Sequence, residues 1–191
     1  MIAGLASVAG LAVLLAAIVA LVVTITTYNS VVAMQRRVEK AWANVDVALR
    51  QRHDELPNLV AAVRGVMSFE RDVLEDVTRA RAAYAPGAPP SRQAATSDAT
   101  SAALRSLFAV VERYPELRSQ ENVMALQQEI ERLEGLIATR RELYNDSVYL
   151  YNATIRQLPA VLMADALGWE PREFFEAEGA ERPPAAVSIG G

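Results

Sequence analysis

Residues 2–25 read IAGLASVAGLAVLLAAIVALVVTI, and the first charged side chain in the protein is Arg36. A helix of roughly 20 apolar residues is long enough to cross the hydrocarbon core of a bilayer, which is roughly 30 Å thick. A cleaved signal peptide is the alternative, and it predicts a basic start, a shorter apolar run and a small-x-small cleavage site. No Lys or Arg precedes this run, and Val22-Val23-Thr24 offers no Ala-x-Ala. The sequence therefore predicts a retained transmembrane anchor at residues 1–27.

The charges beside the anchor predict its orientation. Arg36, Arg37 and Lys40 follow it against a single acid, Glu39, whereas the N-terminal side carries only the α-amino group. Basic residues concentrate on the cytoplasmic side of a membrane span. We therefore expect a single-pass protein of the cell membrane, with the N-terminus outside, the C-terminal domain in the cytoplasm and the lipid bilayer as a partner.

The composition argues against several classes of function. The 191 residues include 19 basic and 23 acidic side chains, for a net charge of −4. The two signs are interleaved along the chain, so no basic stripe indicates nucleic-acid binding. The sequence contains no cysteine, which excludes disulfides, thiolate zinc sites and a cysteine nucleophile.

Apolar side chains after the anchor recur every three or four residues, which is the signature of helices with one buried face. The first series runs from Val38 to Val77 and breaks once, near Pro57, where Asp54 can cap a new helix. This pattern predicts helices at about 28–53 and 55–84, or alternatively one long helix kinked at Pro57.

Residues 85–101 differ in composition from the segments on either side. They are rich in Ala, Pro, Ser, Thr and Gln, which predicts a solvated, mobile linker. A short helix is expected next, at about 102–113, because the residue before Pro115 is disfavoured in the α region.

The longest periodic segment comes last. Ser119 is a suitable N-cap for it, and its apolar residues keep nearly a heptad spacing to Pro159. Arg140 and Ser147 interrupt this coiled-coil pattern, and further leucines widen the stripe toward the face of a globular bundle.

These patterns predict an all-α protein, in which an N-terminal transmembrane helix is followed by an up-and-down antiparallel four-helix bundle over residues 28–158. No run alternates with period two, so no sheet is expected. An apolar, aromatic tail follows at residues 159–178, and residues 179–191 are expected to be disordered. The tail either packs on the bundle or settles on the membrane, and the candidate residues for the membrane interface are Tyr28, Trp169, Phe174 and Phe175.

Several motifs resemble those of the LemA family, in the same order along residues 20–178. They are RVEKAWANVD at 37–46, RHDELPNLV at 52–60, VVERYPEL at 110–117, the pairs Tyr144-Asn145 and Tyr151-Asn152, and REFFE at 172–176. The resemblance implies a bacterial single-pass membrane protein with a helical bundle facing the cytoplasm, and it supplies no mechanism. His53 departs from the family pattern, since an apolar or alanine-like residue is more usual there.

The sequence offers little for catalysis. A di-metal helical bundle needs Glu-x-x-His motifs, and none occurs in this chain, which has a single histidine. Glu131 and Glu134 are expected on a solvated face among arginines. His53 is expected to be a surface residue or a half-buried cap, with a weak pH-responsive group as the alternative. Neither a Gly-x-Ser-x-Gly elbow nor a glycine-rich phosphate loop is present. We therefore expect no catalytic residue, no metal site and no cofactor.

Polar residues embedded in the apolar stripes are the candidate interaction or register residues. They are Asn44, Asp46, Asn58, Tyr144, Asn145, Tyr151 and Asn152. Buried polar groups in a bundle must be paired, and such pairing fixes the register of the helices. The alternative is a groove for a peptide or lipid headgroup, in which the two tyrosines supply amphipathic contacts.

Together these features predict a non-enzymatic, membrane-anchored scaffold or interaction module. Its expected partners are the bilayer and either other proteins or further copies of the chain, with no nucleic acid. The alternative function is a small-ligand sensor or enzyme with a polar site inside the bundle, which needs convergent ionisable groups with shifted pKa values.

Overall fold

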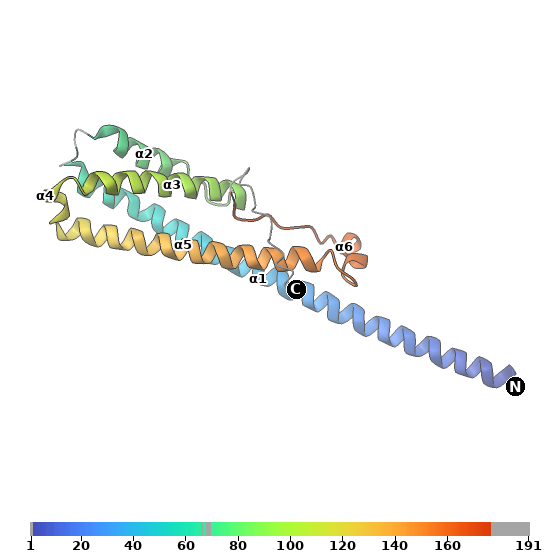
Figure 1. Ribbon diagram of the computed structural model, residues 1–191. Helices are drawn as coiled ribbons and strands as arrows, with labels where there is room; N and C mark the ends of the chain where they lie inside the picture. The colour runs from blue at the N-terminus through green and yellow to red at the C-terminus, as the bar shows by residue number, and fades with distance from the viewer. Residues whose placement is uncertain (1, 66, 68–69, 177–191) are drawn as a thin grey trace, which may run out of the picture. The chain divides into compact units, whose positions relative to one another are not determined.

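The computed structural model describes residues 2–65, 67 and 70–176 of the chain. Its regular elements are α1 (Ile2–Arg64), α2 (Arg71–Ala82), α3 (Pro90–Val111), α4 (Pro115–Arg118), α5 (Glu121–Thr154) and α6 (Val161–Leu167) (Figure 1). The prediction of an all-α protein is confirmed, and the described residues form no strand. The segment 179–191 predicted to be disordered lies outside the described residues, as does the end of the predicted tail.

Two compact units divide these helices. Unit 1 contains the residues up to Val45 together with Glu142–Arg172, and unit 2 contains Asp46–Arg141 and the residues from Glu173 on. Both α1 and α5 therefore contribute one part to each unit.

The first part of α1 is a candidate membrane span. Within the described residues it holds a stretch with a mean hydropathy of 2.5, none of which is buried. The large side chains from Leu11 to Ile25 are exposed, whereas Val31 is fully buried in unit 1. The same helix thus changes from an unpacked apolar rod to a packed core element within a few residues.

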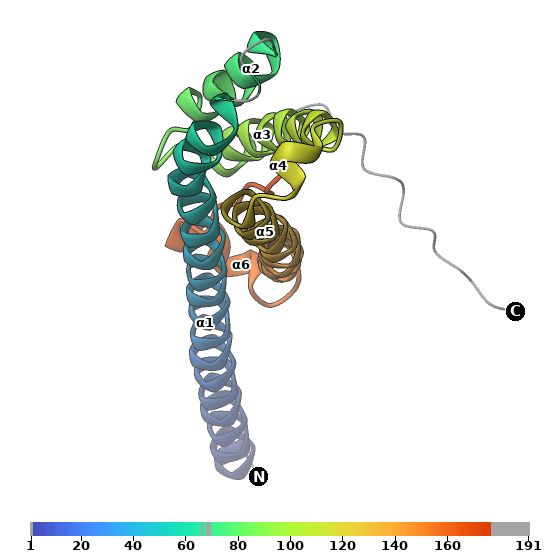
Figure 2. The ribbon, with the colours of Figure 1, turned by 90° about the vertical axis from the view of Figure 1, so that its left-hand side faces the viewer.

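The predicted division into two helices near Pro57 is wrong. The alternative of one long helix agrees with the structure, in which α1 is continuous across this residue. α1 continues through Pro57 to Arg64 (Figure 2), so Asp54 caps no helix. A proline inside a helix removes one hydrogen bond and destabilises it by about 3 kcal/mol. Burial of the neighbouring Leu56, Leu59 and Val63 offsets this loss, because their side chains belong to the core of unit 2.

The predicted linker at 85–101 is also wrong beyond Ala88. Pro89 is the N-cap residue of α3 and Pro90 begins the helix, a position where proline's fixed φ suits the first turn. Alanine has the highest helix propensity, and Ala94, Ser97 and Thr100 are buried on one face. Composition alone therefore predicted a linker where the chain is helical. The helix α3 starts at Pro90, well before the predicted start at about residue 102.

The short connection between α2 and α3 is an ordered turn. The amide of Ala88 donates to the carbonyl of Ala85 over 3.2 Å, and Gly87 between them has a φ of 78°. Pro86 precedes Gly87, and this order of proline and glycine is that of a type II turn.

Ser119 is not the N-cap of the long helix. It is the C-cap residue of α4, where its Oγ donates to the carbonyl of Glu116 over 3.1 Å, and α5 begins at Glu121. The predicted break before Pro115 is confirmed, because α3 ends at Val111 and α4 starts at the proline. α5 ends at Thr154, ahead of Pro159.

The core of unit 2 gathers apolar side chains from the helices α1 to α5 and from the connection after α1. Its members are Leu56, Leu59, Val60, Val63, Met67, Leu74, Val77, Leu104, Leu107, Val110, Val111, Leu117, Val123 and Ile130. α2 and α3 also pack directly against each other. The apolar periodicity of α2 and α3 is visible in the sequence, although the observed bounds of these helices differ from the predicted ones.

The tail begins with a helix whose end needs a glycine. α6 stops at Leu167, and Gly168 takes a φ of 64° and a ψ of 36°, a left-handed conformation that favours glycine. The amide of Trp169 then donates to the carbonyl of Ala164 over 2.9 Å. This bond is the longer-range one of a Schellman cap, and it fixes Trp169 against the end of α6.

Candidate functional site

The two tyrosines predicted as register or groove residues are buried in unit 1. Tyr144 packs on Trp42 with 5.2 Å between ring centroids. Tyr151 is fully buried, and its hydroxyl accepts a hydrogen bond from Nε2 of Gln35 over 3.3 Å. The order of these contacts along α1 is reversed along α5. Both tyrosine side chains are therefore buried within unit 1 and contact side chains of α1.

The predicted asparagines have different surroundings. Asn44 is exposed, as is Asn58, whose Nδ2 donates to Glu55 one turn away over 3.1 Å. Asn145 is half-buried. Asn152 binds the tail twice, since its Nδ2 donates to the carbonyl of Arg172 over 2.9 Å and its Oδ1 accepts from the amide of Arg172 over 2.8 Å.

Asp46 belongs to a small polar group in unit 2. Its carboxylate pairs with Arg50 on the same helix and accepts a hydrogen bond from the hydroxyl of Tyr84 over 3.5 Å. Burial raises the pKa of Tyr84, and the neighbouring Asp46 charge raises it further. The pairing raises the pKa of Arg50 as well. The group links Tyr84, just after the end of α2, to α1.

The four candidates for the membrane interface differ in exposure. Tyr28 is half exposed and its ring lies 6.2 Å from that of Trp169, which is buried in unit 1. Phe175 is fully buried in unit 2, where the guanidinium of Arg141 lies 5.5 Å from its ring centroid. Phe174 is half-buried. The aromatic rings of the tail therefore pack chiefly on protein.

The strongest polar cluster in unit 2 surrounds Arg52, a buried residue that the sequence reasoning missed. Its guanidinium pairs with Glu134 on α5 and donates to the hydroxyls of Ser101 and Ser97 on α3, over 3.0 Å and 2.9 Å. Ser101 lies 2.6 Å from the second carboxylate oxygen of Glu134. Each charged group thus has several partners, as a buried ion pair requires.

A signal for this cluster was present in the sequence. Arg52 lies three residues after Leu49 and four before Leu56, so it falls at the spacing of the buried stripe. A charged residue at such a position must find a partner inside the fold. The expectation that Glu134 lies on a solvated face was wrong in part, because Glu134 is that partner.

His53 lies beside the cluster, half-buried, with its ring centroid 4.8 Å from that of Tyr84. Burial lowers the pKa of His53, and the positive charge of Arg81 lowers it further, against the opposing effect of Asp54. Its Nδ1 has no hydrogen-bond partner among the described residues. A void of about 10 Å³ between His53, Arg52 and Thr100 has about the volume that one water occupies.

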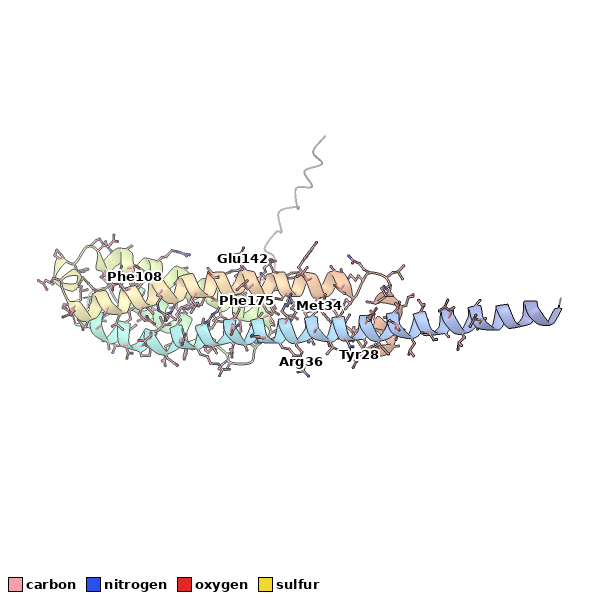
Figure 3. The ribbon with its side chains drawn as sticks, turned by 90° about the horizontal axis from the view of Figure 1, so that it is seen from below. Tyr28, Met34, Arg36, Phe108, Glu142 and Phe175 are labelled. Carbon is pink, nitrogen blue, oxygen red and sulfur yellow. The ribbon has the colours of Figure 1, made fainter. Side chains whose placement is uncertain are left out.

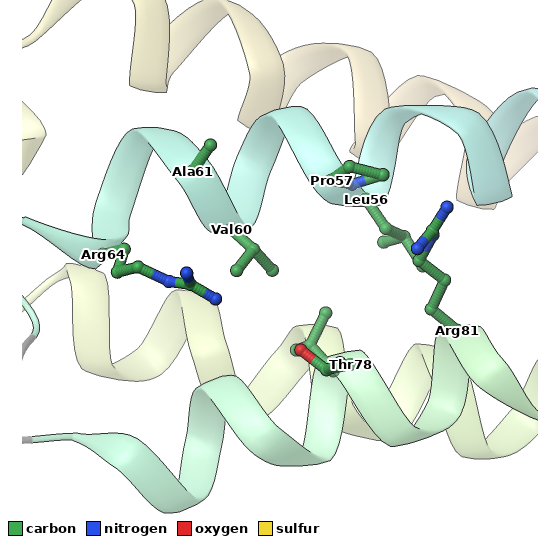
Figure 4. Close-up of a pocket in the computed structure, with 8 residues that line it drawn as sticks. Leu56, Pro57, Val60, Ala61, Arg64, Thr78 and Arg81 are labelled. Atoms are coloured by element: carbon green, nitrogen blue, oxygen red, sulfur yellow. The ribbon is translucent and has the colours of Figure 1, made fainter.

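The described surface of unit 2 also contains an open groove of about 380 Å³ between α1 and α2. Leu56, Val60 and Val77 form its apolar base, and Arg64 and Arg81 lie at its opposite ends (Figure 4). Neither guanidinium pairs with a carboxylate of the described residues. The hydroxyl of Thr78, which also lines the groove, donates to the carbonyl of Leu74 over 2.8 Å.

The residues that line the groove have the composition of a binding surface. The groove offers apolar surface and two cations but no carboxylate, imidazole or free nucleophile among its lining residues. Arg52 and Glu134 are committed to each other. Within the described residues, no group of three or more His, Cys, Asp or Glu side chains is arranged to hold a metal ion.

Comparison with known proteins adds relatives. Over 82 residues, 43% of this chain, the sequence is 35% identical to magnetosome proteins MamQ 1 and MamQ 2 of Paramagnetospirillum magneticum. It is 32% identical over 82 residues to magnetosome protein MamQ of Magnetospirillum gryphiswaldense. The match spans only 30% of the length of each of these relatives.

The family assignment rests on a longer match. The sequence profile of the LemA family matches residues 41–189, which includes the end of α1, every later helix and the Arg52 cluster. This range covers most of the chain and contains the motifs in which Arg52 and Asn152 lie. The protein belongs to the LemA family.

Proposed function

We propose that this protein is a non-enzymatic scaffold, anchored by one membrane span, whose helical domain faces the cytoplasm as an up-and-down antiparallel four-helix bundle. The observation that carries the proposal is α1 itself. Its apolar side chains from Leu11 to Ile25 are unpacked, and the same helix continues without a break into the buried Val31 and Val38. A retained anchor is expected to continue directly into the folded domain, as this helix does. A cleaved leader does not require an uninterrupted helix between itself and the domain.

Contacts within the units support the bundle. In unit 1, Gln35 meets Tyr151 and Trp42 meets Tyr144, an order that suits antiparallel packing of α1 and α5. In unit 2, Arg52 joins segments of α1, α3 and α5 through side chains that are all engaged. A polar core built of satisfied pairs favours a structural role over a catalytic one.

Orientation can be measured because the chain contains no cysteine. Single cysteines are introduced at Ala3, close to the N-terminus, and at Ser106, an exposed position on α3. In intact cells a membrane-impermeant maleimide should label Ala3→Cys and leave Ser106→Cys unlabelled until the cells are lysed. Labelling of Ser106→Cys alone in intact cells would reverse the proposed orientation.

The scaffold role predicts protein adducts that depend on the anchor. Chemical crosslinking of the full chain in its own membrane should give discrete adducts larger than the monomer. A chain that starts at Tyr28 and is expressed to the same level should give fewer of them. Equal adducts from both chains, or none from the full chain, would contradict a scaffold that acts at the membrane.

The groove between α1 and α2 favours a second candidate function, a sensor of small apolar carboxylates. Arg64 or Arg81, at either end of the groove, could bind a carboxylate while Leu56 and Val60 contact its alkyl chain. Octanoate is the probe, with octanol as its uncharged control. Calorimetric binding of octanoate that is lost in Arg64→Gln or in Arg81→Gln, but kept in the exposed Arg71→Gln, would support this candidate. Absence of octanoate binding to the parent would remove it.

A further inference from the structure

The apolar side chains of residues 158–175 fall into two sets with different surroundings. Trp169 and Phe175 are buried, with exposed fractions of 7% and 0%. Leu158 and Leu162 are 74% and 77% exposed, and Val161 and Leu167 are exposed as well. The aromatic residues pack on protein, while the aliphatic residues around α6 form an outward surface with no partner among the described residues.

The outward surface is held beside α1 at the end of the apolar stretch. Ala164, on the opposite face of α6 from Leu162, is buried, and its carbonyl accepts the amide of Trp169. The ring of Trp169 in turn lies 6.2 Å from that of Tyr28, within the same compact unit. Asn152 binds both backbone groups of Arg172 and so secures the other end of the segment. α6 therefore lies next to residue 28 of α1 (Figure 3).

Residue 28 lies at a defined depth in a membrane-spanning helix. If the apolar stretch fills the hydrocarbon core up to Ile25, Tyr28 lies roughly 4 to 5 Å beyond it, at 1.5 Å per residue. Aromatic rings concentrate at this level, among the lipid headgroups. The exposed side chains of Leu158 and Leu162 then lie at the boundary between headgroups and acyl chains.

The charges of the segment suit the same surface. Arg156 and Arg172 are exposed at its two ends, where they can contact anionic headgroups. Two acids, Asp165 and Glu170, lie between these arginines, and both are exposed, so they can stay in headgroup water. Apolar side chains are thus exposed both on α1, from Leu11 to Ile25, and on α6, which the contact of Trp169 with Tyr28 holds near the end of that stretch.

We propose that residues 158–167 form a second membrane contact, in which Leu158, Val161 and Leu162 insert into the interface beside the transmembrane helix. The occupant of this surface is the lipid bilayer. The inference rests on the proposed anchoring of α1, and it assigns to α6 the role of fixing the domain against the membrane. The ring of Trp169 connects the segment after α6 to α1 and does not itself enter lipid.

The test uses the full chain, in nanodiscs that hold one copy each and contain phosphatidylethanolamine and phosphatidylglycerol. Three single-cysteine variants carry the same environment-sensitive fluorophore: Leu162→Cys on the proposed contact, Leu15→Cys in the proposed span and Ser106→Cys as the aqueous reference. Doxyl-labelled lipid should quench the label at positions 15 and 162, and iodide in the buffer should quench the label at position 106.

Different outcomes separate the failure of this inference from failure of the anchor. A label at position 162 that iodide quenches as strongly as the label at 106, while position 15 stays quenched by lipid, would overturn the contact and keep the anchor. A label at 162 shielded from both quenchers would mean that protein covers α6, which also overturns the contact. A label at position 15 that lipid does not quench would overturn the proposed anchoring itself.

Discussion

The buried Arg52 shows how one charged side chain can organise the polar residues around it. It lies at a position of α1 where the neighbouring stripe is apolar, and it collects Glu134, Ser97 and Ser101 around one guanidinium. Removing one partner from a buried pair leaves the other desolvated and without compensation. The cluster therefore stabilises unit 2 only as a complete set.

We expect Arg52→Ala to lower the free energy of unfolding by about 2 to 3 kcal/mol, toward the lower end for buried pairs because Glu134 keeps contact with water. Urea unfolding of the detergent-solubilised chain, followed by circular dichroism, measures this change. Arg132→Ala is the control, since Arg132 pairs with Glu129 on an exposed surface and should change stability by less than about 0.5 kcal/mol. Equal effects of the two substitutions would show that the Arg52 cluster contributes no more than a surface pair.

A second residue-scale prediction concerns pH. The lowered pKa of His53 means that the folded chain takes up the His53 proton at a lower pH than the unfolded chain does. Below about pH 6.5, protonation therefore favours the unfolded state, and the contribution of His53 to stability falls as the pH falls. The Tm should drop less between about pH 7.5 and about pH 5 in His53→Gln than in the parent. Identical drops in both proteins would show that His53 titrates normally.

At the scale of elements, the tail is held to α5 by one amide side chain. Asn152→Ala removes both hydrogen bonds to Arg172, so the segment around Trp169 should loosen. In a Trp42→Phe background, where Trp169 is the remaining tryptophan, its emission should shift to the red and acrylamide should quench it faster. Asn58→Ala is the matched control, because Asn58 is exposed and bonds only within its own helix. An unchanged Trp169 spectrum in Asn152→Ala would show that other contacts hold the tail.

Helix type was easier to predict than helix bounds, and the reasons are physical. Apolar periodicity identified the helical segments because each buries one face, as Val123, Ile130 and Ile137 do on α5. Pro57 and the Ala-Pro-Ser composition of residues 85–101 were misleading, because tertiary burial outweighs the local preference of a proline and small residues pack well on a helix. Ser119 has the chemistry of an N-cap but serves at the preceding C-terminus.

The candidate sites were predictable only where periodicity places a polar side chain in the core. That argument correctly placed Tyr144 and Tyr151 on one face of a helix, and extended to Arg52 it would have found the buried ion pair. The groove between α1 and α2 could not be predicted, because it depends on where the helix following Arg64 returns. The contact of Tyr28 with Trp169 joins residues far apart in the chain, and no local pattern specifies such a pair.

At the scale of the whole molecule, the proposed anchor gives a direct expectation for extraction. The full chain should stay in the membrane pellet after washing with alkaline carbonate, which removes peripheral proteins and leaves spanning helices in place. A chain that starts at Tyr28 should be released. If α6 contributes a second contact, the shortened chain should still bind vesicles weakly, and Leu158→Ser with Leu162→Ser should reduce that binding. Release of the full chain by carbonate would contradict a membrane span.

Because α1 is continuous, the rotation of the proposed span about the helix axis is coupled to that of the domain. Between Gly10 and Pro57 the helix contains neither glycine nor proline, and Val31, Val38 and Val45 are buried at seven-residue intervals. Each residue turns the helix by about 100°, so the lipid-facing side of every span residue has a fixed azimuth relative to those valines. One alanine inserted after Ile25 would rotate the span by about 100°, whereas seven inserted residues would nearly restore the original phase. Torque applied to the span by neighbouring helices in the membrane would therefore act directly on the packed domain.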